Sequence, residues 1–398
     1  MPNIESIKKY KNIHMIGIGG VSMSGIAAIL TKWGFNVTGS DWAKSEATDK
    51  LNSMGIKVTI GHNLEDVDNA DVVVYSAAIK QDDPEMLEAK KLNIPTIERA
   101  DFLGELTRCY KDTICISGTH GKTTTTSMIS LCFLEALKDP SIQVGAFLKA
   151  IDGNYKVGDS EHFIIEACEY VESFLKFSPK AEIILNIDND HLDYFKTFDN
   201  IKNAFVKYVK LLPDDGLLVI NGDDNNCLDL PQYTNAKIIK YGINNKNVNF
   251  YAENIEFDND AFPSFDVYKN GDFFEKIKSR INYHKVPFYS IEMGNMALKE
   301  SMPPALVDRK QFFDDLDKMT FLQIAQKYIS ESDNKGVKTR IKPLLKNIRG
   351  MFKLFCDTRF SLISLYKLLY NNSLLEILHG HFIFPTPHSV IRIRRGAI

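Results

Sequence analysis

The sequence has few of the features that mark membrane-spanning or secreted proteins. Among its 398 residues no apolar run approaches the roughly 20 residues that cross a bilayer. Gly17, Gly19 and Gly20 interrupt the only apolar stretch near the amino terminus, so we expect no signal peptide and a cytoplasmic location. Six cysteines are scattered without a Cys-x-x-Cys pair, which argues against a disulfide framework and against a zinc site.

Charge is nearly balanced over the whole chain but unevenly distributed along it. The formal net charge is −3, and 44% of the residues are hydrophobic, as in a globular protein. Residues 338–398 carry eleven Lys or Arg against two Asp or Glu. Such a reversal commonly accompanies a change of module, and the length favours about two or three domains.

The first hundred residues alternate short apolar runs with helical patterns, which predicts a parallel sheet with crossover helices. The first predicted strand covers residues 12–18. A glycine-rich turn begins at Gly17 and has Ser22 where a dinucleotide fingerprint has its third glycine. Asp41 ends the second predicted strand, at a distance suited to an acid that binds ribose hydroxyls. The pattern predicts a Rossmann-like nucleotide site and does not distinguish NAD from a UDP-sugar.

A second unit begins near Asp112 with a predicted strand, a glycine loop and a helix start. Only two residues separate Gly118 from Gly121, so the loop is shorter than the common Gly-x-x-x-x-Gly-Lys-Ser/Thr phosphate loop. Its N–H groups suit phosphate oxygens, Lys122 adds positive charge, and the Thr123 hydroxyl suits Mg²⁺. The segment predicts a nucleoside triphosphate site; an ordinary glycine turn before a threonine-rich helix is the alternative.

Two further predicted strands end in polar clusters. Residues 163–165 run into Glu166, and residues 183–187 precede a segment that contains His191. Ligands bind at the carboxyl ends of parallel strands, so we expect both clusters beside the phosphate loop. Glu166 and His191 are then candidate Mg²⁺ ligands, whereas His191 taken alone would be a surface or helix-capping residue.

Five motifs in order over residues 12–277 resemble those of the Mur ligases. They are Gly-x-Gly-Gly-x-Ser-Met-Ser-Gly, Ser-Asp, Gly-Thr-His-Gly-Lys-Thr-Thr-Thr-Thr, Glu-Ala-Cys-Glu-Tyr and Asn-Ile-Asp-Asn-Asp-His-Leu-Asp. The motifs are most similar to those of the family member that joins L-alanine to the lactyl carboxylate of UDP-N-acetylmuramate. The resemblance implies a cytoplasmic ligase of peptidoglycan synthesis that uses ATP and Mg²⁺ and forms an acyl phosphate.

The resemblance also implies roles for individual residues. The implied UDP-sugar contacts are Gly17, Gly19, Ser22, Met23, Ser24, Asp41 and Ser76. The implied ATP contacts are Gly118, Thr119, His120, Gly121, Lys122, Thr123 and Thr124, where His120 either contacts substrate or fills a variable position. The implied metal ligands are Thr123, Glu166 and His191, and the implied catalytic residues are Lys122, Asn186 and His191.

The resemblance stops at residue 277. The family's Pro-Gly-x-His-Asn segment is expected just after Ile277 and a third domain further on, but residues 278–398 contain neither pattern. The sequence therefore predicts an α/β protein in three parts. They are a Rossmann-like UDP-sugar domain over residues 1–111, an incomplete phosphate-loop α/β domain that binds ATP over residues 112–277, and an unrelated, mostly helical basic segment over residues 278–398.

Within that last segment, apolar residues at spacings of three and four predict an amphipathic helix over residues 341–355, with basic residues around the rest of it. Packing against a neighbouring helix is the expected role, and contact with an anionic membrane surface is the alternative. No nucleic-acid partner is expected, and the sequence indicates no oligomeric state.

Three functions compete at this point. The ligase is favoured by all five motifs. The second is a catalytically impaired remnant, which would hold UDP-N-acetylmuramate and ATP without turnover because the closing domain is not recognisable. The third, an NAD-dependent dehydrogenase, rests on the first glycine loop alone and leaves the loop at Gly118 unexplained.

Overall fold

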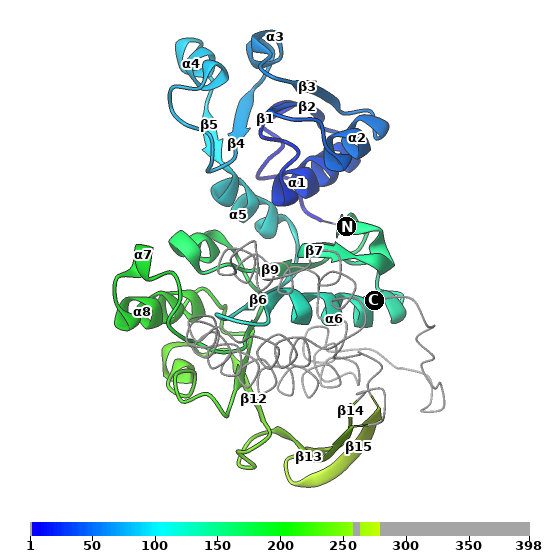
Figure 1. Ribbon diagram of the computed structural model, residues 1–398, viewed down its shortest axis with the longest axis vertical. Helices are drawn as coiled ribbons and strands as arrows, with labels where there is room; N and C mark the ends of the chain where they lie inside the picture. The colour runs from blue at the N-terminus through cyan, green and yellow to red at the C-terminus, as the bar shows by residue number, and fades with distance from the viewer. Residues whose placement is uncertain (1, 258–262, 279–398) are drawn as a thin grey trace, which may run out of the picture. The chain divides into compact units, whose positions relative to one another are not determined.

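The computed structural model of the chain describes residues 2–257 and 263–278 (Figure 1). Among these, residues 2–251 and 269–271 belong to one compact unit, and residues 252–257, 263–268 and 272–278 belong to a second. The predicted basic segment, including the helix over residues 341–355, lies outside the described residues except for Lys278. Within the described part of the chain, no helix combines the length and the hydropathy that crossing a membrane requires.

The first sheet has five parallel strands in the order β3-β2-β1-β4-β5. This doubly wound order reverses direction between β1 and β4, which is where such sheets bind ligands. The elements are β1 (Asn12–Ile16), α1 (Val21–Lys32), β2 (Asn36–Asp41), α2 (Glu46–Ser53), β3 (Lys57–Ile60), α3 (Leu64–Asp68), β4 (Val72–Tyr75), α4 (Pro84–Lys91), β5 (Thr96–Glu98) and α5 (Arg99–Cys109).

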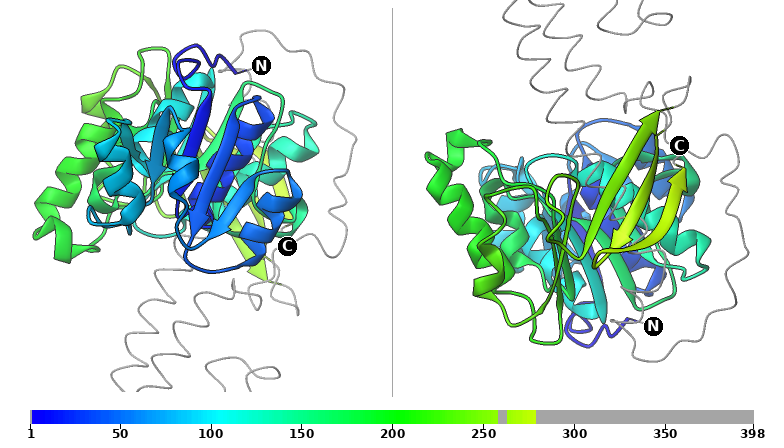
Figure 2. Two further views of the ribbon diagram at one scale, coloured as in Figure 1. Left: turned by 90° about the horizontal axis from the view of Figure 1, so that it is seen from above. Right: turned by 90° about the horizontal axis from the view of Figure 1, so that it is seen from below.

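Helices cover both faces of this sheet. α1 packs against α2, and α3 packs against α4. Right-handed crossovers place these two pairs on opposite faces, an arrangement visible in Figure 2. Because both faces are covered, the central strands are apolar runs: Val72, Val73 and Val74 of β4 are fully buried. The predicted Rossmann-like architecture is confirmed.

The second sheet lies in the same compact unit and runs in the order β12-β11-β10-β6-β9-β7-β8. All neighbours are parallel except β7 and β8. The elements are β6 (Asp112–Ser117), α6 (Lys122–Glu135), β7 (Ser141–Leu148), η1 (Lys149–Ile151), β8 (Gly153–Lys156), β9 (His162–Glu166), η2 (Tyr170–Lys176), β10 (Ala181–Ile184), α7 (Leu192–Phe195), α8 (Phe198–Val209), β11 (Leu217–Asn221), η3 (Leu230–Tyr233) and β12 (Lys237–Gly242).

The core of this sheet is built around its central strand. All six residues of β6 are buried, and α6 packs on β6, β7 and β9. On η2 and α8, Phe174 stacks on Tyr208 with ring centroids 4.2 Å apart and meets Phe205 edge-on at 5.3 Å. This packing joins η2 to α8, and the predicted phosphate-loop α/β fold is confirmed.

Three further strands follow: β13 (Phe250–Phe257), β14 (Pro263–Lys269) and β15 (Asp272–Lys278). The first residues of β13 pair in parallel with Tyr241 and Gly242 of β12. In the second compact unit β14 lies between β13 and β15. The boundary predicted at residue 111 falls between the end of α5 and the start of β6, and it stays a prediction because both sheets share one compact unit.

Candidate active site

The phosphate loop follows β6 at the carboxyl edge of the second sheet. Gly118 and Gly121 have φ angles of 129° and 88°, in the region that favours glycine. A Cβ on Gly118 would lie 3.0 Å from backbone atoms of Asn186. α6 begins at Lys122, so the N–H groups of its first turn, which lack partners within the helix, come directly after the loop. The loop thus has the geometry that suits an anion.

Asn186 and Thr119 fix the shape of this loop from its side. The Asn186 amide accepts from His120 N at 2.8 Å and donates to His120 O at 2.9 Å. Thr119 N donates to Asn186 O at 3.0 Å, and Thr119 Oγ1 accepts from Asp188 N at 2.8 Å. Asn186 therefore helps to hold the loop in shape, because its side-chain amide is hydrogen-bonded to the backbone N–H and carbonyl of His120.

Thr123 lies against the carboxylate at the end of β9. Its hydroxyl donates to Glu166 Oε1 at 3.0 Å, and Gly145 N on β7 donates to Glu166 Oε2 at 2.9 Å. Two oxygen ligands side by side at the start of α6 are the donor set that Mg²⁺ prefers. These two predicted metal ligands are together, and they fit the ion. Thr124, the next residue, is half-buried.

His191 belongs to a neighbouring cluster. Its ligand atom lies within 4.8 Å of those of Glu169 and Asp190, and Tyr170 packs on its ring with centroids 4.6 Å apart. Among the described residues, Glu166 and His191 do not share a cluster of three potential metal ligands. Glu169 and Asp190 were absent from the predicted site, although both lie in the motifs quoted above.

The first glycine loop is held by the end of β2. Ser40 O accepts from Gly17 N at 2.8 Å, and Asp41 Oδ2 accepts from Gly19 N at 2.8 Å. Gly17 has a φ of 78°, and a Cβ on it would lie 3.3 Å from Ser76 Cβ. The structure thus brings together four predicted UDP-sugar contacts, and it gives Asp41 a part in shaping the loop.

The remaining predicted contacts lie at the start of α1. Met23 and Ser24 are each 1% exposed, and the Ser24 hydroxyl donates to Val21 O at 3.2 Å. Ser22 Oγ accepts from Gln143 Nε2 of β7 at 2.6 Å. Sequence reasoning missed Gln143, since it lies on a different sheet and in no recognised motif.

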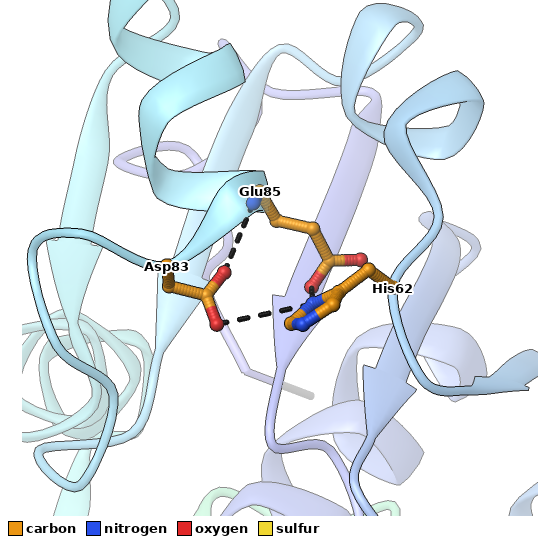
Figure 3. Close-up of side chains that lie close together, drawn as sticks. All are labelled: His62, Asp83 and Glu85. Atoms are coloured by element: carbon orange, nitrogen blue, oxygen red, sulfur yellow. Dashed lines mark hydrogen bonds and ion pairs between the residues drawn. The ribbon is translucent and has the colours of Figure 1, made fainter.

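A second group of two acids and a histidine lies at the start of α4 and in the loop after β3 (Figure 3). Asp83 caps α4 by accepting from Glu85 N at 2.9 Å, and His62 Nδ1 lies 3.6 Å from Glu85 Oε2. Glu85 is fully buried and accepts from Ser40 Oγ at 2.5 Å and from Asn63 N at 2.7 Å.

Burial alone would raise the pKa of Glu85, but hydrogen bonds from His14, Ser40 and the Asn63 backbone outweigh burial and hold that pKa below its ordinary value. The carboxylate is thus charged, and its oxygens are already used by protein donors. We therefore assign this group a structural role: it ties α4 to the strand end that holds the glycine loop.

Two family profiles match the chain, one over each sheet. The profile described as the catalytic domain of the Mur ligase family matches residues 12–111, and the profile of the Mur ligase middle domain matches residues 116–283.

Two curated relatives are named UDP-N-acetylmuramate--L-alanine ligase. The protein from Acetivibrio thermocellus is 49% identical over 273 residues, which cover 69% of this chain and 58% of that protein. The protein from Clostridium botulinum strain Okra is 54% identical over 262 residues, which cover 66% of this chain and 57% of that protein. The chain thus spans 57–58% of the length of these relatives.

Solved structures show the same fold. UDP-N-acetylmuramate-alanine ligase from Thermotoga maritima matches with a TM-score of 0.60 at 27% identity, over 75% of this chain and 66% of that chain. The UDP-N-acetylmuramate:L-alanyl-gamma-D-glutamyl-meso-diaminopimelate ligase from Neisseria meningitides matches with a TM-score of 0.61 at 26% identity, over 73% of this chain and 94% of that chain. Since both profiles match in chain order, each on the sheet that carries its glycine loop, the chain belongs to the Mur ligase family.

Proposed function

We propose that this chain carries the UDP-sugar and ATP sites of a cytoplasmic enzyme that joins L-alanine to UDP-N-acetylmuramate in peptidoglycan synthesis. The observation that carries the proposal is the phosphate loop with Lys122 at its end and the Thr123–Glu166 pair beside it. The 49% and 54% identities to relatives with that activity in their names support the choice of substrates. In this proposal residues 1–111 bind the UDP-sugar, and residues 112–277 bind ATP.

The chemistry requires activation of a carboxylate, which is a poor electrophile. The lactyl carboxylate oxygen attacks the γ-phosphorus of ATP, the bond to ADP breaks, and an acyl phosphate forms. Lys122 and the N–H groups at the start of α6 would stabilise negative charge on the phosphoryl oxygens. Thr123 and Glu166 would hold Mg²⁺, with His191 at the neighbouring position; the ion, when bound, supplies further positive charge at the phosphates.

The second step forms the amide. The alanine amine attacks the carbonyl carbon of the acyl phosphate, phosphate leaves, and the amine loses a proton. Asn186 contributes by holding the loop backbone at His120, so the phosphate-binding N–H groups stay oriented. Catalysis then depends mainly on positioning and electrostatics.

Phosphate release by the full chain tests the proposal. With ATP, Mg²⁺, UDP-N-acetylmuramate and L-alanine together, we expect release that requires all of them and disappears in Lys122→Ala. Calorimetric titration of each nucleotide completes the experiment. Binding of both nucleotides without phosphate release would contradict the ligase and support the catalytically impaired form. Binding of NAD in place of UDP-N-acetylmuramate would support the dehydrogenase.

A further inference from the structure

The lysine of the phosphate loop is engaged by a buried carboxylate. Lys122 Nζ lies 3.1 Å and 2.9 Å from the two carboxylate oxygens of Glu169, which is 1% exposed. The same ammonium donates to Gly118 O at 2.7 Å and to Thr119 O at 3.2 Å. An ammonium has three donors, so these acceptors use all of them. A phosphate oxygen can gain a hydrogen bond from Lys122 only if one of these acceptors is given up.

Of these acceptors, Glu169 is the one that carries a charge, so the contact with Glu169 has the largest electrostatic energy for Lys122 to give up. An ion pair at this depth is weakly screened, and removing one partner leaves an uncompensated buried charge. If Lys122 turned toward a triphosphate, Glu169 would face that added negative charge without a counterion. Another cation must then replace the ammonium beside Glu169.

The structure has a place for that cation. Ligand atoms of Glu169, Asp190 and His191 lie within 4.8 Å of one another, and two carboxylates with one imidazole suit a divalent ion. Asp190 and His191 precede α7, whereas Glu169 precedes η2, so two separate loops bring these ligands together. Glu169 therefore contacts Lys122 and also belongs to a group of potential metal ligands.

We propose that Glu169 is a positioning residue that competes with phosphate for Lys122, and that a divalent cation beside Asp190 and His191 ends this competition. Lys122 then becomes available to the triphosphate only when the cation is present. The inference rests on the proposed ATP site, and it adds a mechanism by which binding of the triphosphate depends on the metal.

Inorganic tripolyphosphate is the probe that tests this mechanism without involving base, sugar or turnover. Its affinity for the full chain is measured by calorimetry in EDTA and in MgCl₂, for the wild type, Glu169→Gln and Glu172→Gln. Glu172 is the matched control because it lies three residues further on and pairs with Lys207 at 2.7 Å, away from the loop. We expect Glu169→Gln to bind tripolyphosphate about tenfold more tightly than the wild type in EDTA, the order of one charge-assisted hydrogen bond.

The gain from Mg²⁺ should shrink in Glu169→Gln and stay at the wild-type level in Glu172→Gln. In a separate titration of Mn²⁺ alone, followed by electron paramagnetic resonance, Glu169→Gln should bind the ion more weakly than both other proteins. Should Glu169→Gln fail to fold, Glu169→Asp keeps the charge on a shorter side chain, and it should bind tripolyphosphate in EDTA more tightly than the wild type.

Equal affinities of the wild type and Glu169→Gln for tripolyphosphate in EDTA would overturn the inference. Failure of the wild type to release phosphate from ATP would instead overturn the proposed function, since the comparison in EDTA needs no turnover. A wild type that does not bind tripolyphosphate even with Mg²⁺ would overturn both.

Discussion

Replacement of Glu85 by glutamine is expected to destabilise the protein at neutral pH, because Glu85 is a buried anion held by three kinds of donor. Its partners are the Ser40 hydroxyl, the Asn63 backbone N–H and the His14 ring, whose Nε2 lies 3.4 Å from Oε1. Glutamine is uncharged and has one carbonyl oxygen, so the Ser40 hydroxyl would have to turn and accept from the new NH₂ group. Loss of the charge-assisted hydrogen bonds to the buried carboxylate should lower the unfolding free energy by about 3 kcal/mol.

The matched control is the fully buried Glu182 of β10. Both of its carboxylate oxygens lack a hydrogen-bond partner among the described residues, and burial raises its pKa well above the ordinary value. Burial therefore favours the protonated, neutral form of Glu182, and glutamine is uncharged and of similar shape. Glu182→Gln should change the unfolding free energy by less than about 1 kcal/mol near pH 5, where little protonation cost applies.

Urea and thermal unfolding measure the two effects, at pH 7 for Glu85→Gln and at pH 5 for Glu182→Gln. With about 2–4 °C per kcal/mol for a domain of 150–250 residues, Glu85→Gln should lower Tm by about 6–12 °C. It should also weaken UDP binding, because the Ser40 carbonyl holds Gly17 N, while tripolyphosphate binding at the other sheet stays unchanged. A Glu85→Gln variant as stable at pH 7 as the wild type, or a loss no larger than that of Glu182→Gln at pH 5, would refute the opposite directions of the two pKa shifts.

The remaining predictions concern pH and the phosphate site. The pKa of Glu182 is raised in the folded protein, so above the unfolded-state pKa folding must take up a proton. As pH rises from 5 to 8, the wild type should therefore lose stability relative to Glu182→Gln, by up to about 1.4 kcal/mol per pH unit. Urea midpoints of the two proteins that change in parallel with pH would contradict this. Gly145→Ala would place a Cβ 2.8 Å from Glu166 Oε2 and push the carboxylate away from Thr123. Calorimetry should then show about tenfold weaker Mg²⁺-dependent ATP binding, whereas UDP binding should be retained. Asn186→Ala removes two hydrogen bonds to His120 and should reduce ATP affinity by about 1–3 kcal/mol, whereas unchanged affinity would show that the loop holds its shape without them.

Much of the fold and part of the site followed from local patterns. Apolar runs separated by helical periodicity predicted two parallel sheets, since each run is an element that buries both faces. The short glycine spacing predicted the phosphate loop, because the turn at Gly118 and the charge at Lys122 are adjacent in the chain. The rule that ligands gather at the carboxyl ends of strands placed Glu166 correctly beside Thr123.

Other contacts could be found only in three dimensions. Glu169 engages Lys122 across 47 positions of the sequence, and Ser40 meets Glu85 across 45. Neither pair has a spacing that a helix or a strand would reveal. These contacts depend on which strands are neighbours and on where each crossover ends.

By itself, then, the sequence determined the two sheets, the two glycine loops and the family to which the chain is similar, because these depend on neighbouring residues and on periodicity. Only the tertiary structure decided which charges meet. It paired Lys122 with Glu169, grouped His191 with Asp190, and lowered the pKa of Glu85 while raising that of Glu182. The physical reason is that the energy of a buried charge depends on its surroundings, and several distant segments of the chain supply those surroundings.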